Sequence, residues 1–264
     1  MLDIKNASKI FSPGTASEHH ALKNLSLHLD RGEFVTVIGS NGAGKSTLFN
    51  AICGNYWLDE GEIVLDGRDI TFLSEHHRAR EIGRVFQDPM KGTAPHLTIE
   101  ENLALAYTRK ERKPFRCAVK RRERELFQEE LARYHMDLEN RMKTPVGLLS
   151  GGQRQVVTLL MCTLVTPKLL LLDEHTAALD PAAAEKIMDI TKEIVRENHL
   201  TAMMITHNLS SALATGTRTI MMDEGNIILD ISGRERDQMT VDELLKRYAA
   251  KKKQRFDSDR ALLN

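Results

Sequence analysis

The chain has 264 residues, of which 41% are hydrophobic and 28% charged, values typical of a globular protein with one or two domains. Its 37 basic and 37 acidic residues cancel to zero net charge, which gives no support to nucleic-acid binding through bulk charge. The longest apolar stretch, residues 158–172, is broken by Pro167 and Lys168, so we expect no membrane-spanning segment. The first residues lack the pattern of a signal peptide, and three widely spaced cysteines suit a reducing cytoplasm. Collagen, a membrane span and a disulfide-stapled secreted scaffold are excluded.

Apolar runs predict strands that alternate with helices along the chain. The runs at 34–38 and 169–172 are continuous, as in parallel strands that are covered on both faces. Further strands are predicted at 63–65, 84–86, 202–205 and 219–222, with a late hairpin at 224–226.

Helix signals lie between these strands. Asp180 and Pro181 begin a predicted helix whose apolar residues share one face through Ile194. Thr98 and Thr240 each begin a capping-box pattern. The alternation predicts an α/β core with a mainly parallel sheet.

The middle of the chain differs from the rest. Residues 88–165 contain helical patterns without a convincing strand, which predicts a helical subdomain inserted in a single domain of residues 1–250. Nine basic residues lie between 109 and 124; a solvated face or linker is one interpretation, and a face near an anionic membrane surface is the other. The basic tail at 251–264 is predicted to be frayed and flexible.

A phosphate-binding motif follows the first strong strand. Residues 39–47 fit Gly-x-x-x-x-Gly-Lys-Ser and open a helical pattern. Glycines let backbone N–H groups converge on phosphate oxygens, and the helix N-terminus adds a favourable partial charge. Lys45 is expected to reach the β- and γ-phosphates, and the Ser46 hydroxyl to bind Mg²⁺. The residues assigned to nucleotide phosphates here are Gly39, Ser40, Asn41, Gly42, Ala43, Gly44, Lys45, Ser46 and Thr47.

Two carboxylates, Asp173 and Glu174, directly follow the apolar strand at 169–172. A buried parallel strand delivers its last residues to the edge where such sheets bind ligands. Asp173 is therefore placed to hold Mg²⁺ through water, and Glu174 to orient or deprotonate an attacking water. The alternative is that two acids merely end a strand, and the phosphate-binding motif favours the catalytic interpretation.

A second anion site is predicted at Leu149-Ser150-Gly151-Gly152-Gln153, where Ser150 caps a following helix. One phosphate-binding loop already accounts for a triphosphate, so a second such site needs an explanation. Here the sequence resembles the ABC-type ATPases, and the resemblance runs through most of the chain. In that family this signature contacts the γ-phosphate of ATP held by the opposite subunit, which implies that role for Ser150, Gly151, Gly152 and Gln153. The resemblance also implies a P-loop NTPase core, an antiparallel β subdomain and an inserted helical subdomain that carries the signature.

Further positions match marks of the same family. Gln87 matches the residue of the Q-loop, which links the core to the helical subdomain and senses Mg²⁺ and water. His207 matches the switch histidine that contacts the γ-phosphate, and residues 178–180 resemble the D-loop of the dimer interface. Phe11 lies where the family places an aromatic ring that stacks on adenine, with core packing as the alternative.

Two positions depart from the family pattern. His175 stands where proline usually follows the catalytic glutamate, and Ala178 replaces the usual D-loop serine. Coupling across the dimer interface is therefore expected to differ, while the groups needed for hydrolysis are kept. The adjacent histidines at 19–20 and 76–77 have poor geometry for a metal without further ligands, so we expect no metal site there.

The resemblance implies a head-to-tail homodimer that sandwiches two Mg·ATP and is closed by γ-phosphate contacts. With one ATPase unit and no span, the chain is expected to be the cytoplasmic, peripheral subunit of an ABC transporter, touching the membrane only through separate permease subunits. Residues 86–103 resemble bacterial importers associated with branched-chain and aromatic amino acids, which implies an amino acid or similar small solute and an extracytoplasmic binding protein.

Other functions stay open at this point. An exporter or lipoprotein-release ATPase would look almost the same in this polypeptide, and a soluble ABC-type ATPase, such as an assembly factor for iron–sulfur clusters, is the second alternative. DNA-repair relatives would carry a long insertion between Gln87 and Ser150, and translation relatives usually carry two ATPase units. A GTPase is disfavoured because no Asn-Lys-x-Asp motif occurs. The solute and the direction of transport are set by contacts in other chains.

Overall fold

The computed structural model describes the backbone of residues 1–110 and 119–262, and their side chains apart from residue 110 and residues 253–262. The chain divides into two compact units, Met1–Leu73 with Met203–Asn264, and Ser74–Ala202. The division falls inside strand β8 (Thr201–Ile205).

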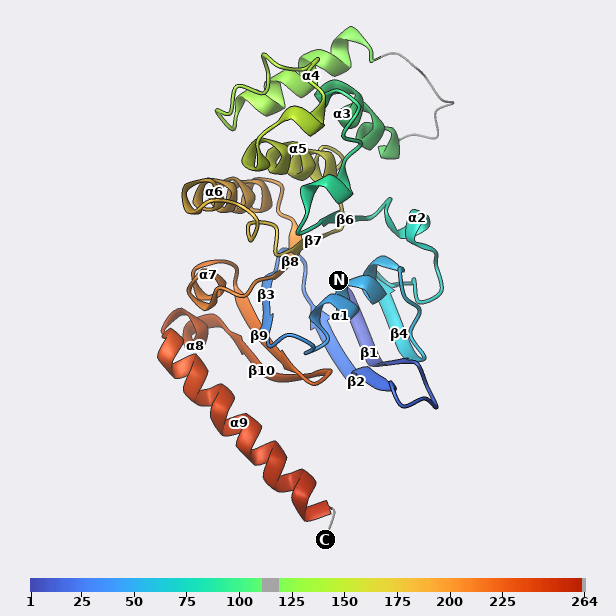
Figure 1. Cartoon of the computed structure of the whole chain (residues 1–264), viewed down its shortest axis with the longest axis vertical. Helices are drawn as coiled ribbons and strands as arrows, with labels where there is room; N and C mark the ends of the chain where they lie inside the picture. Colours follow the sequence, from blue (N-terminus) through green and yellow to red (C-terminus); the bar gives the residue numbers. More distant parts are fainter. Residues whose placement is uncertain (111–118, 263–264) are drawn as a thin grey trace. The chain divides into compact units, whose positions relative to one another are not determined.

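The first unit contains a four-stranded antiparallel sheet with the order β2-β1-β4-β5 (Figure 1). Its strands are β1 (Leu2–Phe11), β2 (His19–Leu29), β4 (Glu60–Leu65) and β5 (Arg68–Asp69). This sheet is the antiparallel β part that the family resemblance predicts. Strands β1 and β2 escaped the sequence analysis because their alternation of apolar and polar residues is broken. The pairing of β1 with β2 shifts register three times between Ile4 and Ile10, so no period of two runs through either strand.

The same unit holds the strand that leads into the phosphate-binding motif. Strand β3 (Phe34–Gly39) pairs in parallel with β9 (Arg218–Asp223), and β9 turns through Glu224 and Gly225 into the antiparallel strand β10 (Asn226–Ser232). Residues 34–38 are all buried, which explains their continuous apolar sequence. The predicted strands at 34–38 and 219–222 and the hairpin at 224–226 are therefore confirmed.

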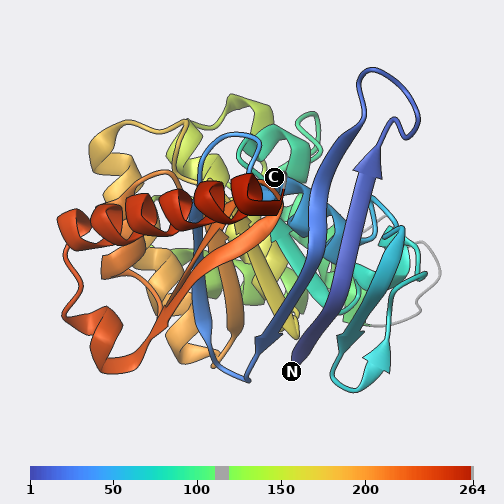
Figure 2. The same cartoon turned by 90° about the horizontal axis from the view of Figure 1, so that it is seen from below.

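Helices of the first unit pack on these strands. They are α1 (Lys45–Cys53), α7 (Leu209–Ala214), α8 (Gly233–Asp237) and α9 (Val241–Leu262). Ala212 of α7 and Leu244 of α9 join Ile38, Met221 and Met239, which precedes α9, in one buried cluster. This cluster anchors the start of α9, and Figure 2 shows the helix running from there across β10.

The second unit has a short parallel strand pair and most of the helices. Strand β6 (Ile82–Val85) pairs in parallel with β7 (Leu169–Asp173). The helices are α2 (Glu75–Arg78), α3 (Ile99–Tyr107), α4 (Arg121–Ala132), α5 (Gly151–Thr163) and α6 (Pro181–Glu197), with 3-10 turns η1 (Pro89–Gly92), η2 (Thr108–Lys110) and η3 (Val146–Leu148). Among the described residues of 88–165 no strand occurs, as the sequence predicts, and an isolated bridge joins Thr98 to Pro145.

The predicted helix starts are borne out by their capping bonds. Asp180 accepts a hydrogen bond from the Ala183 amide at 3.0 Å, with Pro181 in the first turn of α6. Thr98 and Glu101 form both bonds of a capping box. The second predicted box has its forward bond, from the Glu243 amide to the Thr240 hydroxyl at 3.2 Å.

The last helix extends into the segment 251–264, for which a flexible tail is predicted. Helix α9 continues through Leu262. After Thr240 the sequence contains neither proline nor glycine and is rich in Ala, Lys and Arg, which have high helix propensity. A run of basic residues thus extends the helix instead of ending it.

The basic stretch at 109–124 is described only in part, since residues 111–118 lie outside the described part of the chain. Arg109 donates to the carbonyl oxygens of Met161 and Cys162 at 2.7 and 3.0 Å. Arg124 pairs with the buried carboxylate of Glu100 at 2.6 Å. These two arginines therefore hold helices of the second unit together.

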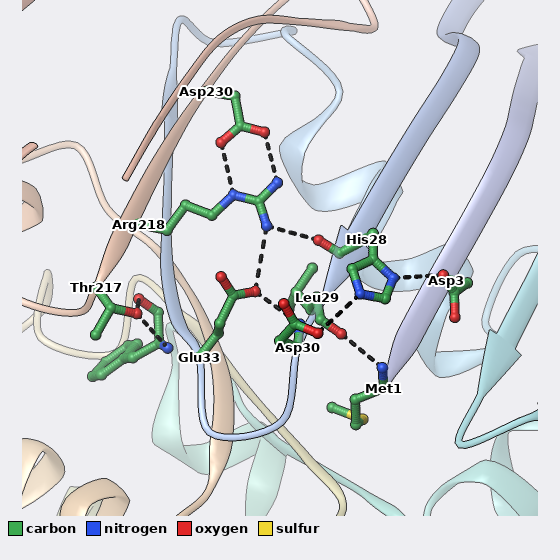
Figure 3. Close-up of polar contacts among 10 residues, drawn as sticks. Met1, Asp3, His28, Leu29, Asp30, Glu33, Thr217, Arg218 and Asp230 are labelled. Atoms are coloured by element: carbon green, nitrogen blue, oxygen red, sulfur yellow. Dashed lines mark hydrogen bonds and ion pairs between the residues drawn. The ribbon is translucent and has the colours of Figure 1, made fainter. Parts of the chain in front are cut away.

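Arg218 joins the two sheets of the first unit (Figure 3). Its guanidinium makes a two-point ion pair with Asp230 at 2.6 and 2.7 Å and donates to the carbonyl oxygen of His28 at 2.7 Å. Glu33 accepts a further bond at 3.3 Å. Because the Arg218 side chain is only 16% exposed, these bonds are poorly replaced by water.

We expect Arg218→Met to lower the free energy of unfolding by about 1–3 kcal/mol, since it removes the guanidinium donor to Asp230, to Glu33 and to the carbonyl oxygen of His28. Denaturant unfolding measures the difference. The matched control is Arg31→Met, which removes an arginine that is 76% exposed and pairs with Asp66; that change should cost less than about 1 kcal/mol. Equal losses of unfolding free energy in the two variants would contradict the proposal that Arg218 links the two sheets.

Candidate functional site: a phosphate-binding loop and a strand-end acid pair

The loop after β3 is shaped by its glycines. Gly44, the N-cap residue of α1, has φ +97°, and a Cβ there would lie 2.4 Å from the carbonyl oxygen of Ala21. A Cβ on Gly39 would lie 2.2 Å from the carbonyl oxygen of Met222. Both positions combine a backbone angle in the left-handed half of φ space with a close backbone approach, so a side chain is excluded twice.

Lys45 folds back into this loop. Its ammonium donates to the carbonyl oxygens of Gly39 and Ser40 at 2.8 and 2.9 Å, and the residue is 5% exposed. A buried ammonium held by carbonyl dipoles keeps its positive charge aimed at the loop interior. The exposed hydroxyl of Ser46 lies in the first turn of α1, where the amides have no partner within the helix. A buried ammonium and a helix N-terminus are groups that can bind an anion.

Two contacts near this loop were not foreseen from the sequence. The Ser40 hydroxyl donates to Asp223 at the end of β9 at 3.2 Å. The ring of Phe11 packs edge-on against Tyr56, with centroids 5.2 Å apart, and Phe11 stays partly exposed. Phe11 is therefore not a core residue, and the Phe11–Tyr56 pair is partly exposed to solvent. A Tyr just after a helix C-cap carries no sequence signal of its own.

In the second unit, functional candidates follow the ends of adjacent strands. The parallel register pairs Val85 with Leu172, so Asp173 and Glu174 leave β7 at the same edge where Gln87 follows β6. Gln87 is exposed, and both acids are partly exposed. Both carboxylates therefore leave the strand at the edge where the sequence predicts a ligand.

Glu174 has an unusual backbone. Its φ is +47°, in the left-handed region that a residue with a Cβ seldom adopts. The carbonyl oxygen of Glu174 accepts from the Ala177 amide at 2.9 Å, which closes the tight turn after the strand. Strain of this kind is retained where the surrounding structure holds it, and it often marks functional sites.

Asp173 has a partner that the sequence analysis missed. The Arg84 guanidinium donates to Asp173 Oδ2 at 2.8 Å, and the two side chains are 12% and 15% exposed. The sequence feature that could have indicated this partner is the single arginine within the otherwise apolar strand at 82–85.

The signature segment at Ser150 is a complete capping box. Ser150 accepts from the Gln153 amide, and Gln153 Oε1 accepts from the Ser150 amide, both at 3.2 Å. The Gln153 side chain also donates to the Met136 carbonyl at 3.2 Å, so its amide group is engaged inside the unit. A Cβ on Gly151 would lie 3.0 Å from Leu179, which favours glycine at that position. Ser150 and Gly151 are exposed at the start of α5.

His207 follows strand β8 and is exposed. The next residue, Asn208, caps α7 by accepting from the Ser211 amide at 2.9 Å. The Thr206 amide donates to the carbonyl of Val37 at 3.2 Å, which ties this segment to β3 inside the first unit. His207 is thus presented by a short, capped turn after a buried strand.

The donor set suits one kind of metal. Within residues 1–110 and 119–262, no three His, Cys, Asp or Glu side chains gather to form a metal cage. The Asp173 carboxylate and the Ser46 hydroxyl are hard oxygen donors, the kind that Mg²⁺ uses together with phosphate oxygens and water. Each of these side chains, taken by itself, is therefore a suitable ligand for a phosphate-bound Mg²⁺.

Comparison with known proteins identifies the family. Residues 22–177 match the ABC transporter family. The chain is 43% identical over 248 residues to the tyrosine transport ATP-binding protein of Clostridioides difficile, covering 94% of this chain and 98% of that protein. It is 31% identical to the phosphonates import ATP-binding protein PhnC of Lactobacillus johnsonii, over 92% and 95% of the two chains.

Solved structures agree. A dimeric post-hydrolysis ATP-binding cassette bound to ADP and phosphate superposes with a TM-score of 0.75 at 31% identity, covering 88% of this chain and 98% of the other. A nucleotide-free cassette from an ABC transporter gives 0.74 at 26% identity, covering 90% and 93%. The fold and the site define a P-loop ATPase. The chain belongs to the ABC transporter family, and it is an ATP-binding ATPase subunit that energises transport.

His175, which departs from the family pattern, is buried against α6. Its Nε2 lies 3.0 Å from the Thr191 hydroxyl, which itself donates to the Ile187 carbonyl at 2.7 Å. The hydroxyl has one proton, so Nε2–H is the donor to it. Burial lowers the pKa of His175 to about 4 from an ordinary 6.5.

We expect this histidine to make stability depend on pH. Between pH 6.5 and about 4 the unfolded chain binds a proton that the folded chain does not, so stability falls as the pH is lowered through that range. The loss attributable to His175 is up to roughly 3 kcal/mol. Unfolding measured from pH 7.5 to 4 should show a shallower decline for His175→Gln than for the parent, and parallel curves would contradict the assignment.

Proposed function

We propose that the chain is the ATP-hydrolysing subunit of a bacterial importer for an aromatic amino acid such as tyrosine. The observation that carries the substrate class is the near full-length relationship to a tyrosine transport ATP-binding protein. Relatives named for import of phosphonates and of sulfate or thiosulfate at 31–33% identity support import as the direction.

The proposal gives each candidate residue a role. Lys45 and the loop amides hold the β- and γ-phosphates, while Phe11 stacks on adenine with Tyr56 behind it. Glu174 orients the attacking water and takes up its proton, and His207 contacts the γ-phosphate. The assigned nucleotide-binding set is Gly39, Ser40, Asn41, Gly42, Ala43, Gly44, Lys45, Ser46 and Thr47 from the loop, with Ser150, Gly151, Gly152 and Gln153 from the signature.

One assignment within this set is narrower than the sequence analysis had it. The side chain of Gln153 bonds to Ser150 and Met136, so its proposed contribution is to hold the cap in shape. In this segment, the groups proposed to contact the nucleotide are then the Ser150 hydroxyl and the backbone amides at the start of α5.

Mg²⁺ is the second proposed cofactor. Ser46, Asp173 and Gln87 would hold it, directly or through water, at the phosphate oxygens. The ion supplies charge neutralisation for the developing phosphate charge. The chain's own residues orient the nucleotide and water around it.

The proposed working form is a head-to-tail homodimer on two permease subunits. A solved relative is a dimer with ADP and phosphate, which supports the dimer. The exposed Ser150 and Gly151 at a helix N-terminus fit a γ-phosphate presented by a second copy. No helix among residues 1–110 and 119–262 is long and apolar enough to cross a bilayer. We infer a cytoplasmic, peripheral location, membrane contact through the permease alone, an extracytoplasmic binding protein and no nucleic-acid partner.

The two-site dimer is tested with Glu174→Gln. This variant keeps the shape of the side chain but cannot accept a proton, so it should bind Mg·ATP, lose at least about 99% of ATPase activity and remain dimeric. Light scattering with and without Mg·ATP measures the association. Glu185→Gln, an exchange of the same kind on helix α6, is the control and should hydrolyse ATP like the parent. A Glu174→Gln variant that stays monomeric in Mg·ATP would contradict the head-to-tail dimer.

The substrate class is tested by transport. Cells in which Glu174→Gln replaces the parent chain should lose energy-dependent uptake of labelled tyrosine, while cells with Glu185→Gln keep it. Recovery of the solubilised Glu174→Gln complex with a permease and a tyrosine-binding extracytoplasmic protein would agree. Unchanged tyrosine uptake would reject tyrosine as the solute. Recovery of soluble partners alone would reject the transporter and leave a soluble ATPase.

A further inference from the structure

A permanent positive charge lies against the proposed metal carboxylate. Arg84 Nη2 and Asp173 Oδ2 are 2.8 Å apart, and neither side chain is more than 15% exposed. In this setting the guanidinium neutralises much of the negative charge that a divalent cation would otherwise meet. Arg84 has no role in the assignments given above.

Strand geometry explains why this contact forms. In the parallel pair of β6 and β7, Arg84 is opposite Leu171. Residues two apart in a strand point to the same face, so Leu171 and Asp173 share a face, and a side chain as long as arginine reaches the diagonal neighbour. The contact is therefore built into the register of two strands and does not depend on a loop.

A second contact holds the guanidinium in place. Its Cζ lies 4.8 Å from the ring centroid of Phe86, which follows the strand. Arginine stacks well on aromatic faces because its charge is delocalised and weakly hydrated. Held between a ring and a carboxylate, the charge has little freedom to swing away from Asp173.

We propose that Arg84 is a positioning residue that acts through Asp173 and lowers the affinity of this site for Mg²⁺. The proposal rests on the proposed function, in which Asp173 binds the ion. Arg84 occupies Oδ2, which leaves Oδ1 for a metal-bound water, and its charge opposes the approach of a second cation. Metal binding then depends on the charge that the nucleotide phosphates add.

The sign of the effect follows from Coulomb's law. Repulsion between two like unit charges about 4 Å apart in water lowers the binding constant of the second charge about fivefold. For a divalent ion at a partly buried site, the binding constant falls roughly tenfold or more. Removing the charge of Arg84 should therefore tighten Mg²⁺ binding. A purely structural role would leave Asp173 less well oriented and weaken Mg²⁺ binding, which is the opposite sign.

The test measures metal affinity and not turnover. All variants are made in the Glu174→Gln chain, which we expect not to hydrolyse ATP, and binding of a fluorescent ATP analogue is followed by anisotropy as free Mg²⁺ is raised from a metal-free buffer. Arg84→Met keeps the length of the side chain without its charge and should lower the half-maximal free Mg²⁺ about tenfold. Arg84→Lys keeps the charge and should stay within about threefold of its parent. Arg84→Gln is a second uncharged variant, used if Arg84→Met does not give the circular dichroism of the folded chain.

Two further variants separate the possible failures. Arg121→Met removes an arginine that is 91% exposed and should leave the Mg²⁺ midpoint unchanged. Asp173→Asn should abolish the response to Mg²⁺. If Asp173→Asn responds like its parent, the metal assignment fails and the role of Arg84 fails with it. If Asp173→Asn loses the response but the uncharged Arg84 variants show an unchanged or higher midpoint, the Arg84 proposal alone is overturned.

Discussion

Two of the candidate site segments lie at the ends of buried parallel strands. Residues 34–38 of β3 and 169–172 of β7 are buried, so their interiors accept apolar side chains almost exclusively. At the end of each strand the apolar run stops and glycine or acidic residues follow. Strand β3 ends in Gly39 and the phosphate-binding loop, and β7 ends in Asp173 and Glu174. In each unit the candidate residues are available because the backbone leaves the sheet at that point.

The exception to this rule is Arg84, a cation within a strand of four residues. It is accommodated because Asp173 and the ring of Phe86 replace the water that its guanidinium loses. Burying such a pair in place of apolar side chains brings little stability. Its value therefore has to be sought in the function of Asp173, which is why the pair carries the inference about metal affinity.

Positive φ angles also occur at these strand ends, among other places in the chain. Gly39 and Gly44 adopt positive φ where a Cβ would meet a carbonyl oxygen, and Glu174 adopts a φ of +47° although it has a Cβ. Glycine removes the steric cost in the loop, whereas Glu174 retains it. A glutamate kept in a conformation that glycine or asparagine would adopt more easily points to a need for its carboxylate at that place.

Several turns, helix caps and candidate site segments are determined by local sequence. The loop at 39–47, the acids at 173–174 and the caps at Thr98, Ser150 and Asp180 are each decided by residues within a few positions of one another, so they could be predicted from the sequence. The family and its ATPase activity follow from those motifs. Strands β1 and β2 could not be predicted, because bulges break their period and they depend on pairing with each other and, for β1, with β4.

Tertiary structure alone decided the contacts between distant residues. Arg84 meets Asp173 across 89 positions of sequence, and Arg218 meets the carbonyl of His28 across 190. The engagement of the Gln153 side chain with Met136, and the burial of His175 against Thr191, also depend on which elements pack together. Such pairs leave no periodic or local trace in the sequence, because the geometry that joins them is created only when the strands and helices assemble.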